Sequence, residues 1–369
     1  MSLRGHEEFM RLAMDQAHRG EGTTSPYPSV GCVIVKGGRV VGRGFTQPKG
    51  REHAEVHALK RLGNRAKGAT LYSTLEPCHH NDYTDCEPCS QWIVGSGIRT
   101  VVWGARDPNP KNAGGCTRWL SARRVRVIGR VLQKECEQLH EVFLVSLARK
   151  RPFVLVSTAV SLDGKITWQK GKSSKGEFSS GAAFRRVHDL RSRVDAIGVG
   201  ITTIQIDNPR LTARVGHRST PARVIIDSHC ETPVSAKVFE AKQGAVIVVT
   251  TAYAPLIRRE ELVAAGAQVI VAAETSTGQV NLKDALKRLY QQGITSLMIE
   301  GGGELIASAL KARLVDKVYL WYAPLLIGGR DTPTLVEGEP LERLSDATRL
   351  KDVTSEKIGN DILIGGYIR

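Results

Sequence analysis

The sequence predicts an α/β protein made of two domains, each built on its own sheet. The chain has 369 residues, more than one hydrophobic core usually serves, so two domains of about 150–200 residues each are expected. Residues 1–147 alternate helical and strand patterns, and residues 153–369 contain short apolar strands with helical stretches between several of them. The basic stretch 148–152 is the expected linker.

The first domain is predicted to be a layered α/β sandwich. Apolar residues at helical spacing indicate a helix over 5–19, which Gly20 ends. Gly37-Gly38 separates two apolar runs and predicts a tight hairpin. The expected strands are 30–35, 39–42, 69–75, 100–103 and 125–128, with helices near 53–62, 90–94 and between the last two strands.

The second domain is predicted to hold a mostly parallel sheet covered by helices. Its apolar runs are nearly continuous rather than alternating, which is typical of strands buried on both faces. The expected strands are 153–156, 196–199, 224–226, 246–249, 269–271, 297–299, 318–322 and 362–364.

Composition favours a cytoplasmic protein. Apolar residues make up 41% of the chain and charged residues 24%, and no apolar run reaches the roughly 18–20 residues of a membrane helix. The first eight residues carry charges where a secretory signal is apolar. Seven cysteines, an odd number, argue against a disulfide framework and for metal ligands or buried thiols.

The formal net charge of +15 indicates an anionic partner. Nucleic acid and phosphorylated small molecules both fit such a charge. Because the basic residues are scattered and form no long block, nucleic acid is disfavoured. We expect a small phosphorylated substrate, no membrane partner and a homo-oligomer.

Three residues have the spacing of a catalytic zinc site. His53 opens a predicted helix, Cys78 follows a strand, and Cys89 precedes another helix. One imidazole and two thiolates leave the fourth tetrahedral position of Zn²⁺ open for water, whose pKa the metal can lower to about 7. Cys89 is favoured as the third ligand because it directly follows Pro88 and begins a helix, but Cys86 is the alternative.

Glu55 is the predicted catalytic residue. Two positions after His53, in the first turn of the helix, its carboxylate can lean over the metal-bound water and shuttle protons. The pattern His-x-Glu followed by Pro-Cys-x-x-Cys is the signature of zinc deaminases. Chance is the alternative explanation, but each half of the pattern lies beside a predicted helix start, which argues against it.

Across nearly its whole length the chain resembles the bifunctional deaminase–reductase family of riboflavin biosynthesis. The resemblance rests on motifs in the same order and spacing in both halves: His53-Ala54-Glu55-Val56-His57, Thr74-Leu75-Glu76-Pro77-Cys78, Asp107-Pro108-Asn109-Pro110, Ser161-Leu162-Asp163-Gly164-Lys165, Asp207-Asn208-Pro209-Arg210-Leu211-Thr212 and Glu300-Gly301-Gly302-Gly303. It implies a cytidine-deaminase-like three-layer domain followed by a dihydrofolate-reductase-like domain.

The resemblance also implies two reactions. The first domain would hydrolyse the 2-amino group of 2,5-diamino-6-(5-phosphoribosylamino)pyrimidin-4(3H)-one with Zn²⁺, and the second would reduce the ribosyl to the ribityl group with NADPH. A phosphorylated substrate and cofactor would account for the basic charge. The implied substrate-binding residues of the reductase are Arg191, Leu211, Arg214 and Glu300. The implied cofactor-binding residues are Ala159, Thr203, Asp207, Ser228, Gly302 and Gly303.

The residue types agree in part with these roles. A strand running into three glycines and then a helix suits a pyrophosphate, although a plain tight turn fits equally well. Arginine suits phosphate because its guanidinium donates two parallel hydrogen bonds, whereas a solvated surface charge is the simpler alternative for Arg191 and Arg214.

Some positions differ from the usual pattern of the family. Tyr27 stands where asparagine is usual, the loop 79–87 is longer and lacks an arginine, Ser157 replaces a lysine and Glu177 a tryptophan. A paralogue acting on a related pyrimidine or pterin nucleotide is therefore a second interpretation. A third is a nucleic-acid base deaminase with a non-catalytic C-terminal module, which leaves the reductase-like motifs unexplained.

Overall fold

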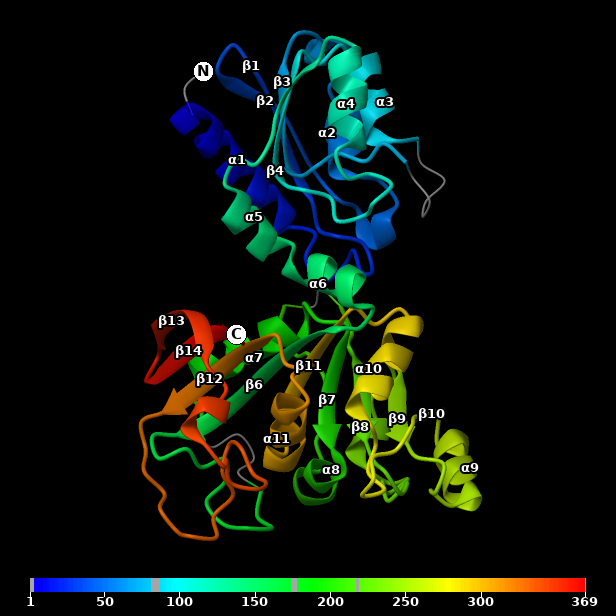
Figure 1. Cartoon of the computed structure of the whole chain (residues 1–369), viewed down its shortest axis with the longest axis vertical. Coiled ribbons are helices and arrows are strands. Elements are labelled where there is room, and N and C mark those ends of the chain that lie inside the picture. Colours follow the sequence, from blue (N-terminus) through cyan, green and yellow to red (C-terminus); the bar gives the residue numbers. More distant parts are fainter. Residues whose placement is uncertain (1–2, 81–86, 174–177, 217–218, 369) are drawn as a thin grey trace. The chain divides into compact units, whose positions relative to one another are not determined.

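The computed structural model (Figure 1) describes residues 3–80, 87–173, 178–216 and 219–368. The chain divides into two compact units, Met1–Lys150 and Arg151–Arg369. The division falls inside the stretch 148–152, but helix α6 (Glu141–Arg149) of the first unit continues into that stretch. Residues 148 and 149 are therefore helical.

The first unit is built on a five-stranded sheet with the order β2-β1-β3-β4-β5. β1 pairs antiparallel with β2 and β3, and β3, β4 and β5 run parallel. The predicted hairpin at Gly37-Gly38 joins β1 to β2. The strands are β1 (Gly31–Lys36), β2 (Arg39–Phe45), β3 (Thr70–Leu75), β4 (Thr100–Ala105) and β5 (Arg126–Ile128). The other helices are α1 (Leu3–Ala17), α2 (Ala54–Lys60), α3 (Cys89–Gly95), α4 (Gly115–Ala122) and α5 (Gln133–Leu139).

Two glycines let helices approach this sheet closely from opposite faces. A Cβ on Gly31 would lie 1.9 Å from the Ala13 carbonyl of α1, and one on Gly44 would lie 2.2 Å from the Ala54 carbonyl of α2. Gly44 pairs with Cys32, the neighbour of Gly31, so the two glycines face opposite sides of the sheet. Figure 1 shows α1 and α5 on one side and α2, α3 and α4 on the other. The predicted three-layer architecture is confirmed.

The second unit is built on a nine-stranded sheet with the order β10-β9-β8-β7-β11-β6-β12-β14-β13. The strands from β10 to β12 are parallel, and β14 pairs antiparallel with both β12 and β13. The strands are β6 (Phe153–Ser161), β7 (Ala196–Gly200), β8 (Ala222–Ile226), β9 (Val246–Thr250), β10 (Ala267–Val271), β11 (Ser296–Gly301), β12 (Lys317–Ala323), β13 (Leu350–Ile358) and β14 (Asp361–Ile368).

Helices cover both faces of this second sheet. They are α7 (Gly181–Arg191), α8 (Ile201–Asp207), α9 (Leu256–Ala264), α10 (Leu282–Gln291) and α11 (Gly303–Lys311). Val154 and Val156 of β6 belong to a core with α10 and α11, whereas Ala159 lies with Trp321 in a cluster that includes α7. Since side chains alternate along a strand, these clusters lie on opposite faces. The predicted mostly parallel, helix-covered sheet is confirmed.

One strand of the second unit was not predicted. β13 lies at the edge of the sheet, and all of its residues except the two at its ends are exposed. An exposed edge strand needs no apolar pattern, so its sequence carries no strand signal. In the described part of the chain, no helix is long and apolar enough to cross a membrane.

Candidate zinc centre and reductase site

His53 is placed by the start of α2. It is the residue just before the helix, with extended backbone (φ −71°, ψ 155°), and its carbonyl accepts the bond from the His57 amide that begins the helix. Because α2 lies against Gly44 of β2, the start of this helix is held at a fixed place beside the sheet. The second helical residue, Glu55, is buried there.

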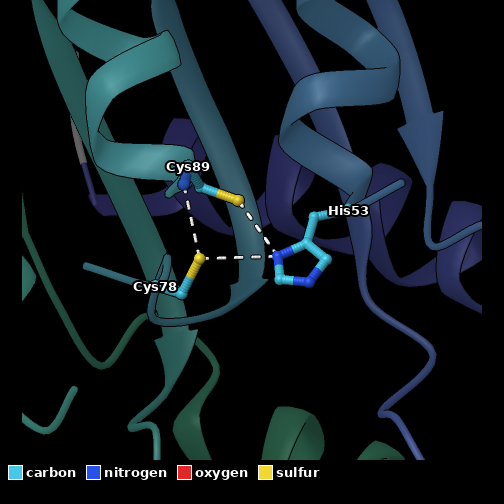
Figure 2. Close-up of side chains that lie close together, drawn as sticks. All are labelled: His53, Cys78 and Cys89. Carbon is cyan, nitrogen blue, oxygen red and sulfur yellow. Dashed lines mark hydrogen bonds between the residues drawn. The ribbon is translucent and has the colours of Figure 1, made fainter. Parts of the chain in front are cut away.

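Cys78 and Cys89 converge on the imidazole of His53. The Nδ1 atom lies 3.2 Å from Cys89 Sγ and 3.5 Å from Cys78 Sγ, and the Cys89 amide donates to Cys78 Sγ at 3.3 Å. Figure 2 shows the ring turned with this nitrogen toward both sulfurs. One ligand atom from each residue lies within 4.8 Å of the others. Such a group can hold one metal ion.

The chemistry of these donors fits zinc. The hydrogen bond from Cys89 lowers the pKa of Cys78 well below that of a free thiol, with His53 adding to the shift against the effect of burial. The Cys78 thiolate and burial in turn raise the pKa of Cys89. A second thiolate therefore needs a cation beside it, and a dication with N and S preference supplies that charge.

Cys89 is the first residue of α3, as the sequence predicts. The alternative ligand, Cys86, lies outside the described residues. His57 is not in the cluster: its Nδ1 accepts from the Phe45 amide at 3.3 Å and lies 3.1 Å from Gln47 Nε2, so it anchors β2 and the turn after it.

Glu55 borders the cluster without being part of it. Its side chain is 3% exposed; Oε1 accepts from Ser73 Oγ at 2.8 Å, and Oε2 lies 3.4 Å from Cys89 Sγ. Burial raises the pKa of the Glu55 carboxyl, and the neighbouring His53 opposes that shift. A carboxyl group that borders a metal site without belonging to the ligands can act there as a general base and then as a general acid.

The loop between β4 and α4 borders the same site, and sequence reasoning did not assign roles to its polar residues. Asn112 Oδ1 accepts from the His79 and His80 amides at 3.1 and 2.8 Å. Buried Glu76 accepts from the Gly114 amide at 3.1 and 3.2 Å. Burial raises the pKa of Asp107 to about 6. Asp107 belongs to a motif on which the family resemblance rests, and that motif was the feature of the sequence that could have identified it as a site residue.

In the second unit, the glycine turn lies at the carboxyl ends of two neighbouring parallel strands. β11 ends in Gly301, and Gly302, with φ +85°, precedes α11. A Cβ on Gly301 would lie 3.3 Å from Thr203 Oγ1, which comes from the helix after β7. Ligands bind at this edge of open α/β sheets. The structure thus brings together Thr203, Gly302 and, at the start of α11, Gly303.

The predicted substrate residues form a second group in the same unit. Arg191 donates to both carboxylate oxygens of Glu300 at 2.6 and 2.5 Å and to the Thr212 carbonyl at 3.0 Å. Arg214 donates through its amide to His188 Nδ1 at 3.0 Å, and its Nη2 lies 3.1 Å from His188 Nε2. His188 was missed by sequence reasoning. Burial and the two arginines lower its pKa to about 3, so it is neutral and adds no charge.

The remaining predicted residues have various surroundings. The Ser228 hydroxyl donates to Gln279 Oε1 at 3.0 Å and accepts from the Val280 amide at 3.0 Å. Asp207 ends α8 and is exposed, and Leu211 is buried. Ala159 lies beside Trp321, whose Nε1 donates to Ser157 at 3.0 Å. Glu177 lies outside the described residues.

A three-layer α/β unit with a His/Cys/Cys cluster and an adjacent buried glutamate defines the class of zinc-dependent deaminases, here followed by a unit with a nucleotide-type glycine turn. Comparisons with known proteins agree. Residues 3–105 match the family model for the cytidine and deoxycytidylate deaminase zinc-binding region, and residues 152–364 match that for the RibD C-terminal domain. The chain belongs to the RibD family of riboflavin biosynthesis proteins.

Relatives match along nearly the full chain. The riboflavin biosynthesis protein RibD of Actinobacillus pleuropneumoniae is 36% identical over 97% of this chain and 94% of its own length. That of Escherichia coli is 33% identical, with coverage of 97% and 98%. Among solved structures, Acinetobacter baumannii RibD has a TM-score of 0.88 at 30% identity, with full coverage of both chains.

A second solved structure carries both activities in its description. The deaminase/reductase of Thermotoga maritima, described as a diaminohydroxyphosphoribosylaminopyrimidine deaminase and 5-amino-6-(5-phosphoribosylamino)uracil reductase, has a TM-score of 0.86 at 31% identity and covers 100% of this chain and 99% of its own. The present chain is accordingly a bifunctional enzyme, with a zinc-binding deaminase domain and a reductase domain that uses NADPH.

Proposed function

We propose that the deaminase acts on 2,5-diamino-6-(5-phosphoribosylamino)pyrimidin-4(3H)-one and that the reductase then converts the ribosyl group of the product to ribityl. The observation that carries the proposal is the group of His53, Cys78 and Cys89 with Glu55 beside it but outside it. Three ligands leave room for water on the metal, and the carboxylate of Glu55, which is not one of them, can transfer protons. The substrate is that of the Thermotoga maritima neighbour.

His53, Cys78 and Cys89 would hold the zinc ion. When bound, zinc lowers the pKa of water to about 7 and so makes hydroxide available at neutral pH. Cys78 already favours its thiolate form, because of the hydrogen bond from Cys89 and the nearby His53. Nδ1 of His53, which faces both sulfurs, is the nitrogen that would bind the metal.

Glu55 would move the protons of the deamination. Water adds at the ring carbon that bears the 2-amino group, and Glu55 takes the proton of that water through Oε2, the oxygen on the ligand side. It gives this proton to the ring nitrogen, then takes the proton of the newly added hydroxyl group and passes it to the departing amino group. Ammonia leaves, and the carbon keeps the oxygen.

Arg191, Leu211, Arg214 and Glu300 would bind the substrate of the reductase, and Ala159, Thr203, Asp207, Ser228, Gly302 and Gly303 its cofactor. When bound, NADPH supplies the hydride for C1′ of the ring-opened ribosyl group. Arg214 is the best-supported phosphate ligand: no acidic side chain forms a salt bridge with it in the described part of the chain. Arg191 is instead paired with Glu300. Ser228 is the least supported, since both hydrogen bonds of its hydroxyl stay within the protein.

Three further proposals concern the domain borders, the cellular location and the oligomeric state. We propose that the domain borders are 1–147 and 153–369 with 148–152 as linker, that the protein acts in the cytoplasm, and that it is a homo-oligomer. The mass in solution, measured by light scattering, tests the last of these.

Product analysis tests the proposed function. The purified enzyme is incubated with the diaminopyrimidine nucleotide, with and without NADPH, and products are identified by mass spectrometry. We expect exchange of one amino group for oxygen in both samples, and the gain of two hydrogens only with NADPH. Turnover of a related pterin or pyrimidine nucleotide in preference to this substrate would instead support the paralogue.

A further inference from the structure

Ser73 is a buried hydroxyl in the middle of the first sheet. It lies on β3, between β1 and β4, where it pairs with Cys32 on one side and Trp103 on the other. Its side chain is 0% exposed. An isolated hydroxyl at such a position destabilises a core, because it loses its hydrogen bonds to water. A buried hydroxyl at this position therefore needs a hydrogen-bond partner.

That partner is the carboxylate of Glu55. Ser73 Oγ donates to Oε1 at 2.8 Å. The other carboxylate oxygen, Oε2, lies 3.4 Å from Cys89 Sγ. The two carboxylate oxygens are thus in different surroundings, one facing the sheet and one facing the proposed metal ligands. A carboxylate with one oxygen tied in this way cannot rotate freely about its last bond.

The neighbouring hydroxyl on the same strand does something else. Thr74 Oγ1 accepts from the Gly31 amide at 3.0 Å and lies 3.0 Å from His140 Nε2. It thus connects β3 to β1 and to the residue that precedes α6, on the other face of the sheet from Ser73. Of these two neighbouring hydroxyls on β3, Ser73 is the one that contacts Glu55.

We infer that Ser73 is a positioning residue for deamination, which holds one oxygen of Glu55 so that the other faces the ligand group. The inference rests on the proposed role of Glu55 as proton carrier. Ser73 touches neither substrate nor metal, and acts only through the carboxylate. A small misplacement of a catalytic group lowers the rate of the chemical step more than it lowers substrate binding.

The first test compares Ser73→Ala with Ser146→Ala. Ser146 is also a buried hydroxyl of the first unit, but it donates to the Phe143 carbonyl at 3.3 Å, within α6. For Ser73→Ala we expect a kcat of deamination about 10- to 100-fold lower, with KM within about threefold of the parent value. Zinc content per chain, measured by atomic absorption, stays unchanged. Ser146→Ala keeps kcat, KM and zinc.

The second test asks whether the effect passes through Glu55. We expect Ser73→Ala to add no further loss to the residual rate of Glu55→Gln, since residues that act as a unit are not additive. We expect Ser73→Thr, which keeps the hydroxyl, to retain most of the parental kcat. Loss of zinc in Ser73→Ala, a parental kcat in that variant, or a further loss in the double variant overturns the inference.

These outcomes distinguish a failure of the inference about Ser73 from a failure of the proposed role of Glu55. If Glu55→Gln alone deaminates at the parental rate, the proposed role of Glu55 fails, whatever Ser73→Ala does. If Glu55→Gln loses activity and Ser73→Ala does not, only the inference about Ser73 fails.

Discussion

Glu55 is proposed to transfer protons, whereas His53, Cys78 and Cys89 are proposed to bind zinc, and single substitutions can separate these two roles. Glu55→Gln keeps the size of the side chain and the contact to Ser73 but removes the proton-accepting oxygen. We expect zinc content to stay unchanged and deamination to fall about 10²- to 10⁴-fold. Glu52→Gln is the control, since Glu52 lies outside the site and pairs with Lys60. Loss of zinc in Glu55→Gln would show that Glu55 is a ligand instead.

The third ligand is tested by removing thiols one at a time. Cys89→Ala deletes one of the two sulfurs that face His53, so we expect zinc binding to be lost. Cys86→Ala and Cys136→Ala should keep zinc; Cys136 is an equally buried thiol on α5, outside the group. Zinc content after dialysis against a weak chelator is the measurement. Zinc loss in Cys86→Ala with retention in Cys89→Ala would reverse the assignment.

Spacing along the chain predicted the metal residues, because each of them stands where a helix begins or a strand ends. His53, Cys78 and Cys89 do come together in the structure. Ser73 and His188 were not foreseen. Each lies inside an ordinary strand or helix, and its contacts with Glu55 and with Arg214, respectively, join segments that are distant in sequence, so no local pattern marks them.

At the scale of elements, α11 depends on a close contact at its first residue. A Cβ on Gly303 would lie 2.6 Å from the Thr334 carbonyl and from Glu337 Cγ. Gly303→Ala must therefore push the helix start and the segment 334–337 apart, at a cost of about 1–3 kcal/mol in the free energy of unfolding. We expect weaker NADPH binding as well, measured by titration. Gly181→Ala, where a Cβ would meet only the end of Arg185 at 3.7 Å, should change neither quantity.

His140 makes the junction of α6 with the sheet sensitive to acid. Its imidazole is buried, Nε2 lies 3.0 Å from Thr74 Oγ1, and burial lowers its pKa from 6.5 to about 4. The unfolded chain therefore binds the proton first, so stability is lost as pH falls from about 6.5 to about 4, by about 3 kcal/mol in all. Urea unfolding at several pH values measures this slope. His140→Gln should flatten it, and an unchanged slope would place the titration elsewhere.

Strand and helix patterns predicted most elements for a physical reason. Buried strands such as β7, β9 and β11 are apolar on both faces, so their residues signal the sheet directly. β13 shows the limit of that rule, because pairing with β14 holds it at the edge while its side chains stay in water. A strand held mainly by backbone hydrogen bonds leaves little trace in the side-chain pattern.

For the whole molecule, the length of the chain and two unrelated sets of motifs predicted two units with one reaction each. The order of those reactions can be tested on the complete enzyme. We expect Glu55→Gln, supplied with the diaminopyrimidine nucleotide and NADPH, to yield neither deaminated nor reduced product, because in the proposed function the reductase acts on the deaminated compound. Given the deaminated compound directly, the same variant should reduce it at the parental rate, since Glu55 belongs to the first unit and the glycine turn to the second. Mass spectrometry distinguishes the products. A reduced compound that still carries its 2-amino group would show that reduction comes first.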